Sequence, residues 1–105
     1  MGKGYVSEFM SGGRIVAHGK ITDLSDGFKL SNGVPFSVYV RPKNNVSALD
    51  TIINAKCYQD EECSEAPVPL NDWSPMAIVE LAPDTELLKS YDVYWGSGQS
   101  VEGGI

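Results

Sequence analysis

The chain has 105 residues, 42% hydrophobic and 21% charged, which fits one globular domain and argues against bulk disorder. Its net charge of -6 argues against nucleic acid as a partner, because an acidic surface repels the phosphate backbone. No apolar run approaches the roughly 20 residues of a membrane span, and the first residues lack the apolar segment of a signal peptide.

Turn-forming residues divide the N-terminal half into short strands. Residues 14–21, preceded by two glycines and followed by a polar turn, predict the first strand. Asn32 and Gly33 lie between the apolar segments 28–30 and 34–40 and predict a two-residue hairpin turn, since a type I′ turn needs positive φ at both positions. Alternating apolar and polar residues in the second of these segments give it one buried face.

The middle of the chain is less regular. Residues 42–45 predict a loop, and 46–56 are ambiguous, because the segment could open a short helix although 51–58 fit a strand better. Residues 59–66 predict an acidic loop. Residues 67–70 contain two prolines, which cannot donate to a ladder, so they predict an extended segment that is not a central strand.

The C-terminal part supplies the most apolar strand candidates. Residues 76–81 form a near-continuous apolar run, typical of a central strand covered on both faces. Residues 83–88 predict either one helical turn or a loop anchored by two leucines. Residues 91–95 predict the last strand, and its alternation places Asp92 and Tyr94 on the face opposite to the other three side chains.

These elements predict an all-β fold, a small antiparallel β-sandwich or barrel of six to eight short strands. We expect residues 1–105 to form a single domain with extended terminal arms. Residues 1–12 would be the N-terminal arm, and residues 96–105 a glycine-rich C-terminal tail.

No motif in the sequence indicates catalysis. His18 is the only histidine, and no nucleophile motif accompanies it. Ser97, in a Gly-Ser-Gly context, lacks the strand–turn–helix setting of a nucleophile elbow. We therefore expect a protein that is not an enzyme and has no cofactor.

Two cysteines and an acidic run are the candidate metal ligands. Cys57 and Cys63 could share a zinc site, but such a site needs four ligands, and two reduced thiols or an optional disulfide fit better. Residues 60–62 are acidic but lack the ligand spacing and central glycine of a calcium loop. We expect no bound metal.

One segment resembles a known group of proteins. It runs from Asn71-Asp72-Trp73-Ser74-Pro75 to Tyr91-Asp92-Val93-Tyr94-Trp95-Gly96-Ser97-Gly98. It resembles the C-terminal part of small structural proteins of tailed bacteriophages, in which a short β domain decorates or completes the virion shell. No functional residues carry over from that group.

The resemblance implies a non-enzymatic capsid decoration or accessory protein, made in the host cytoplasm and located in the virion. Its partners would be capsid or other virion proteins and further copies of itself. We expect the arms to become ordered on the shell or on sister copies, which costs about 1–2 kcal/mol per residue and requires either many contacts or avidity from the lattice. The candidate interface anchors are Tyr5, Phe9, Tyr94, Trp95 and Ile105.

Two other functions remain open. An acidic inhibitor or nucleic-acid mimic that blocks a host factor would use Asp60, Glu61, Glu62 and Glu65. A carbohydrate-binding module would use an aromatic platform of Trp73, Tyr91, Tyr94 and Trp95. Core packing and interface anchoring also favour such aromatic residues.

Overall fold

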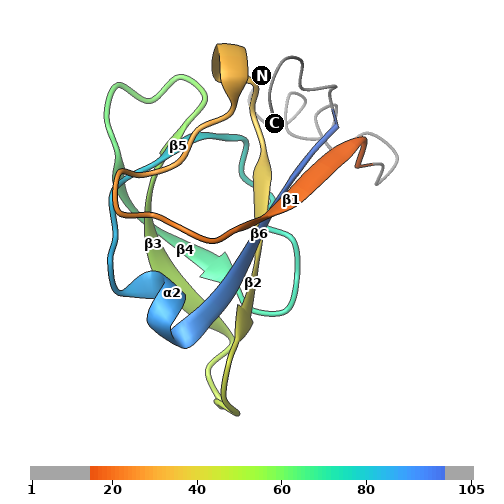
Figure 1. Cartoon of the computed structure of the whole chain (residues 1–105), viewed down its shortest axis with the longest axis vertical. Coiled ribbons are helices and arrows are strands. Elements are labelled where there is room, and N and C mark those ends of the chain that lie inside the picture. Colours follow the sequence, from red (N-terminus) through yellow and green to blue (C-terminus); the bar gives the residue numbers. More distant parts are fainter. Residues whose placement is uncertain (1–14, 99–105) are drawn as a thin grey trace.

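The computed structural model describes residues 15–98, which form a nearly all-β domain (Figure 1). The helical elements are the 3-10 turn η2 (Ser31–Gly33) and the single-turn helix α2 (Leu87–Ser90). In this part of the chain, no helix has the length and apolar character needed to cross a membrane. The described strands are β1 (Ala17–Ile21), β2 (Ser37–Pro42), β3 (Asp50–Cys57), β4 (Ser64–Pro69), β5 (Ile78–Leu81) and β6 (Tyr91–Ser97).

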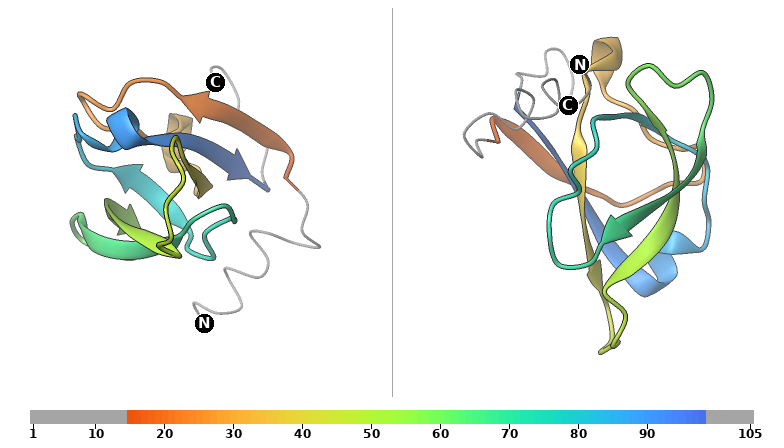
Figure 2. Two further views of the ribbon diagram at one scale, coloured as in Figure 1. Left: turned by 90° about the horizontal axis from the view of Figure 1, so that it is seen from below. Right: turned by 180° about the vertical axis from the view of Figure 1, so that it is seen from behind.

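The strands form two antiparallel sheets, as the predicted fold class required. Sheet A has the order β1-β6-β2, and sheet B has the order β4-β3-β5. Figure 2 shows the two sheets from below and from behind. Between β4 and β5 the chain runs along the second edge of β2, where the amides of Asn71 and Ser74 donate to the carbonyls of Val40 and Val38, both at 2.8 Å. This segment therefore links the two sheets.

The core lies between the sheets and is built from alternate residues of the strands. Phe36, immediately before β2, is 0% exposed, and its ring meets Phe28 edge to face with centroids 5.3 Å apart. Val93 and Trp95 of β6 are buried and Tyr94 is partly exposed, which confirms the predicted alternation in the last strand.

A glycine makes room for the tryptophan in the core. Gly19 of β1 lies directly opposite Trp95 of β6. A Cβ atom at Gly19 would lie 2.7 Å from the indole Nε1 of Trp95, closer than van der Waals contact allows. Strand β1 can therefore pass over the Trp95 ring, because Gly19 has no side chain that would clash with it.

The predicted hairpin at residues 32–33 is correct in conformation and wrong in pairing. Asn32 and Gly33 have φ values of 61° and 67°, as such a turn requires. The flanking segments do not pair with each other, because β5 takes both: Phe28 bridges Leu81, and Phe36 bridges Ile78. Turn geometry is local, whereas the choice of pairing partner depends on which apolar edge packs into the core.

Sheet B corrects two further predictions. The predicted acidic loop 59–66 is too long, since β4 begins at Ser64, where ladder pairing with Ala55 outweighs the low strand propensity of its polar residues. The apolar segment 76–81 is not a central strand, because β5 is an edge strand of sheet B. Among residues 15–98, its other edge forms two isolated bridges and no ladder. By contrast, 67–70 was correctly kept off the sheet centre, because β4 is an edge strand.

The region 83–88 contains the start of a helical turn, one of its two predicted forms. The helix α2 begins at Leu87, whose side chain is buried. The Asp84 carboxylate accepts hydrogen bonds from the backbone amides of Glu86 and Leu87, at 2.9 and 3.0 Å. These bonds fix the chain direction just before β6.

Candidate functional site

Aromatic and charged side chains gather on the outer face of sheet A, opposite the core. Strand register places Lys20 of β1, Tyr94 of β6 and Tyr39 of β2 in one row across the sheet. The ring centroids of Tyr39 and Tyr94 are 6.4 Å apart, and those of Tyr39 and Trp73 are 5.4 Å apart. We call this region the Tyr94 surface; it comprises Lys20, Tyr39, Arg41, Trp73, Asp92 and Tyr94.

Trp73 is held on this face by its backbone and by a glycine. Its amide donates to the Asp72 carboxylate at 2.8 Å, and the next residue, Ser74, bonds to β2 through its backbone. The hydroxyl of the buried Ser37 donates to the Ser74 carbonyl. Below the indole lies Gly96, where a Cβ atom would lie 2.9 Å from Cη2 of Trp73. Because Gly96 has no side chain, the indole of Trp73 can pack directly on the backbone of the sheet.

Asp92 organises the charges at the edge of the Tyr94 surface. Its two carboxylate oxygens lie 3.5 Å from Lys20 Nζ and 3.3 Å from Arg41 Nη2. Arg41 also donates to the Tyr94 hydroxyl at 3.2 Å, and both cations lie within 6 Å of the Tyr94 ring centroid. Charge and aromatic contacts thus meet at one tyrosine.

We predict that Asp92 titrates below its ordinary pKa of 3.8. Partial burial raises this pKa, but the hydrogen bond from Arg41 and the charge of Lys20 outweigh that effect and lower it. A lowered pKa stabilises the fold above the ordinary value, and this contribution is lost as the pH falls through the lower, folded-state value. The measurement is an NMR pH titration of the Asp92 side-chain carboxyl.

Arg41→Gln is the matched variant, because it keeps much of the side chain but removes the charge. We expect it to move the midpoint for Asp92 back towards 3.8. A wild-type midpoint at or above 3.8 would contradict the described arrangement of charges.

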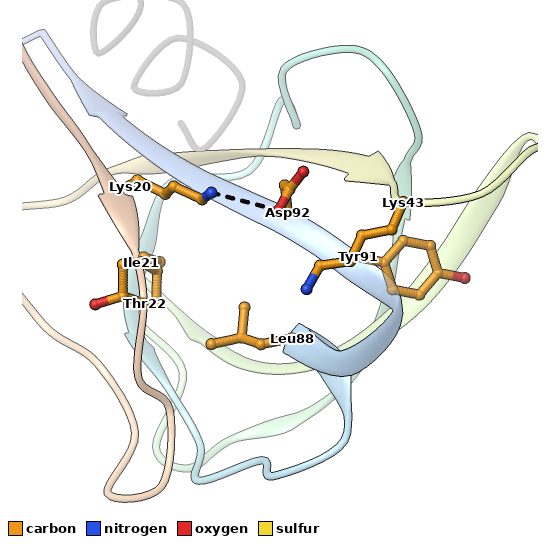
Figure 3. A pocket seen from close by; sticks show the side chains of 7 residues that line it. All are labelled: Lys20, Ile21, Thr22, Lys43, Leu88, Tyr91 and Asp92. Atoms are coloured by element: carbon orange, nitrogen blue, oxygen red, sulfur yellow. Dashed lines mark ion pairs between the residues drawn. The ribbon is translucent and has the colours of Figure 1, made fainter.

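A small pocket adjoins the Tyr94 surface between β1, α2 and β6. Its volume is about 180 Å³, and Lys20, Lys43, Leu88, Tyr91 and Asp92 are among its lining residues. Figure 3 shows the Lys43 side chain running into the pocket while Lys20 reaches towards Asp92. Within residues 15–98, Lys43 forms no ion pair, so its amine is available to a ligand carboxylate or other anion.

The turn between β3 and β4 carries the acidic run. We call residues 57–64 the acidic hairpin, after the exposed side chains of Asp60, Glu61 and Glu62. The Asp60 carboxylate accepts from the amide of Cys57 at 3.0 Å, and the Asp60 amide donates to the Cys57 carbonyl at 3.0 Å. These bonds hold the turn in shape.

Both cysteines, Cys57 and Cys63, lie within the acidic hairpin and are free thiols. Burial raises the pKa of Cys57, and the charge of Asp60 raises it further. Burial and the charge of Glu80 also raise the pKa of Cys63. Such thiols hold little thiolate at neutral pH and are poor nucleophiles. Residues 15–98 contain no group of three or more histidine, cysteine, aspartate or glutamate side chains that could share a metal ion.

The predicted anchors have different outcomes. Tyr94 lies on the outer face, partly exposed, as its position in the strand alternation required. Trp95 is wrong as a surface anchor, since it is 4% exposed and packs in the core with the same parity as Val93. Tyr5, Phe9 and Ile105 lie outside the described residues.

The predicted tail begins too early. Gly96 and Ser97 belong to β6, and the Ser97 hydroxyl donates to the Pro35 carbonyl at 3.0 Å in a buried position. Gly96 pairs with both β1 and β2, and Ser97 pairs with β1, which the glycine-rich composition did not indicate.

Four residues of the Tyr94 surface were not predicted as site residues: Lys20, Tyr39, Arg41 and Asp92. Tyr39 and Arg41 stand at alternate positions opposite to the buried valines of β2, so strand periodicity was the signal that could have found them. Lys20 joins them only through the register of β1 with β6.

This arrangement gathers side-chain types that are common in binding surfaces. Tyrosine, tryptophan and arginine together, partly exposed and surrounded by polar groups, are typical of the energetic centre of a protein interface. In comparisons with known proteins, no protein-family model, curated protein or solved structure matches the chain.

Proposed function

We propose that the chain is a non-enzymatic structural protein of a virus particle, a bacteriophage capsid decoration or accessory protein. It binds its neighbours in the particle through the Tyr94 surface. The observation that carries the proposal is the grouping of Tyr39, Trp73 and Tyr94 on the outside of a small rigid sheet. Arm docking stays a further prediction, because residues 1–12 and 99–105 lie outside the described residues.

The Tyr94 surface is available to a partner. The side chains of Lys20 and Arg41 are 48% and 54% exposed, and the three rings are partly exposed. Its aromatic centre is fixed by the backbone bonds around Trp73, so little conformational entropy is lost when it binds. A fixed aromatic centre with a charged rim is suited to binding the surface of another protein.

A carbohydrate platform fits this geometry less well. The ring planes of Tyr39 and Trp73 are inclined by 65°, and those of Tyr39 and Tyr94 by 71°. A sugar stacks on a flat ring face, and these edge-to-face rings do not form one continuous flat surface. Trp95, which a platform would also use, is in the core.

The virion setting is supported by the resemblance of residues 71–98 to small phage structural proteins. That segment contributes Trp73, Asp92 and Tyr94 to the surface, and Gly96 beneath the indole. A particle presents many identical binding sites, so contacts that are modest in one copy gain avidity when neighbouring copies are held together.

The test measures occupancy on purified virions by quantitative mass spectrometry. We expect the wild-type chain in many copies per particle and at least about a tenfold lower occupancy for Tyr94→Ala, because truncated aromatic anchors typically cost more than about 1.4 kcal/mol of binding. Trp73→Ala should act in the same direction.

Leu49→Ala is the matched control, because Leu49 is 85% exposed and lies outside the Tyr94 surface. It should leave occupancy unchanged, and circular dichroism should show all variants folded. Absence of the wild-type chain from purified particles would overturn the virion role. Full occupancy by folded Tyr94→Ala and Trp73→Ala proteins would overturn the docking role of the surface.

A further inference from the structure

Positive charge on this acidic protein is concentrated at one place. Half of the lysines and arginines in residues 15–98 lie together, namely Lys20, Arg41 and Lys43. Lys20 and Arg41 share the Asp92 carboxylate, and Lys43 lines the adjoining pocket together with Lys20 and Asp92, so the three cations gather around a single acidic pocket residue. The local excess of positive charge attracts a further anion.

The pocket beside Asp92 has room to receive that anion. Its volume of about 180 Å³ is more than ten times the roughly 10–15 Å³ that a cavity needs to hold one water, so it has room for one acidic side chain. Figure 3 shows the Lys43 side chain directed towards the pocket, which Leu88 and Asp92 also line. A carboxylate entering there meets Lys43 and Lys20 and rests against the apolar Leu88.

A complementary group is present on the same chain. The acidic hairpin exposes Asp60, Glu61 and Glu62 on a turn that hydrogen bonds hold in one shape. In Figure 1 this turn, in green between β3 and β4, lies at the upper end of the molecule, whereas α2 and the start of β6, beside the pocket, lie towards the lower end. The rear view in Figure 2 agrees.

We propose that the chain associates head to tail, with the acidic hairpin of one copy docked on the Lys20–Lys43 pocket of the next. The two surfaces differ and lie at different ends, so the contact is heterologous and generates rings or open rows, not closed pairs. The inference rests on the proposed function for its setting, a particle surface on which many copies stand side by side.

Charge complementarity selects a second copy as the occupant. Exposed ion pairs are individually weak and are screened by salt, so a single contact between free copies is weak as well. The association should therefore grow with protein concentration and fall with ionic strength. On a particle, neighbouring copies would be held at high effective concentration.

The experiment is sedimentation velocity over a concentration series at low salt, with two charge-altered variants of the full chain. One variant carries Lys20→Gln and Lys43→Glu in the pocket, and the other carries Glu61→Lys and Glu62→Lys in the acidic hairpin. We expect the wild type to associate and each variant alone to associate at least about tenfold more weakly, since it brings like charges together. Salt at about 1 M, where the screening length is about 3 Å, should abolish the wild-type association.

An equimolar mixture of the two variants is the decisive sample. Each then meets a partner with the complementary charge, so association should return to about the wild-type level. Lys29→Glu, a charge reversal at an exposed residue outside both surfaces, should behave as wild type.

Three results would overturn the inference: a wild type that stays monomeric at low salt and high concentration, variants that associate as the wild type does, or a mixture that stays monomeric. None of these concerns occupancy on virions. A monomeric chain that still needs Tyr94 to occupy particles would refute head-to-tail association and leave the proposed function standing. A chain that associates as described but is absent from particles would refute the proposed function alone.

Discussion

Replacing Phe36 by alanine is expected to lower the free energy of unfolding by about 3–5 kcal/mol. Phe36 is 0% exposed, and its ring packs edge to face on Phe28. Its backbone exchanges two hydrogen bonds of 2.8 Å with Ile78, so the residue stands where sheet A meets sheet B. Alanine keeps the backbone bonds and removes the ring, leaving a cavity between the sheets. Urea denaturation followed by circular dichroism measures the change.

Two further variants serve as comparisons for Phe36→Ala. Phe36→Leu refills much of the cavity and should lose less, about 1–2 kcal/mol, which keeps the comparison possible if the alanine variant does not fold. Leu49→Ala, at a residue 85% exposed, should change stability by no more than about 0.5 kcal/mol. Equal losses for Phe36→Ala and Leu49→Ala would mean that Phe36 is not at the centre of the core.

The features that the sequence predicted well are local. Alternation in 91–95 correctly separated Val93 and Trp95 from Tyr94, because side-chain direction in a strand depends only on parity. The prolines in 67–70 correctly kept that segment at a sheet edge, because the missing amide hydrogen is a property of the residue itself. The positive φ values at Asn32 and Gly33 are likewise local, because these residue types adopt that backbone region readily.

The features that the sequence did not predict are long-range. Phe28 and Phe36 flank a turn and would pair in an isolated hairpin, yet each bridges β5, more than 40 residues further along the chain. The apolar run containing β5 offered two buried residues, Ile78 and Leu81, to which both phenylalanines could pair while their rings stayed in the core. Packing between distant segments thus decides which segments pair, and it leaves no periodic pattern in the sequence.

In the candidate site, too, the local features could be predicted from the sequence and the long-range ones could not. Strand parity alone predicts Tyr94 on the outer face, and the same parity places Trp95 with the core residue Val93, so only Tyr94 of the two fits a surface anchor. Tyr39 and Lys20 reach Tyr94 through strand pairing across long stretches of chain. The charged pocket needed α2 and β1 side by side, which composition could not indicate.

Two glycines connect the core of sheet A to its outer surface. Gly19 leaves room for Trp95 on the inner side, and Gly96, next to Trp95 in β6, leaves room for Trp73 on the outer side. One strand thus carries a buried ring and supports an exposed one. Because the support is part of the central strand, the Tyr94 surface is as rigid as the sheet beneath it, which favours binding without rearrangement.

Replacing Gly27 by alanine is expected to lower the free energy of unfolding by about 2–5 kcal/mol, for two separate reasons. The residue has a φ of +81°, where a side chain costs about 1–2 kcal/mol. Its new Cβ would also lie 2.6 Å from the carbonyl oxygen of Leu81, and crowding in a packed region adds about 1–3 kcal/mol. That oxygen accepts the amide of Phe28 at 3.0 Å, so moving it breaks the bridge between this segment and β5.

Gly33 provides the control that separates the two reasons. Its φ is +67°, so alanine meets the same unfavourable backbone region, but nothing lies within 4 Å of the added Cβ. Gly33→Ala should therefore lose only the backbone part, about 1–2 kcal/mol. The difference between the two variants, measured in the same urea denaturation series, is the cost of displacing the Leu81 carbonyl. If the two losses are equal, Gly27 is required for its backbone conformation alone, and the bridge from Phe28 to Leu81 contributes little to holding the sheets together.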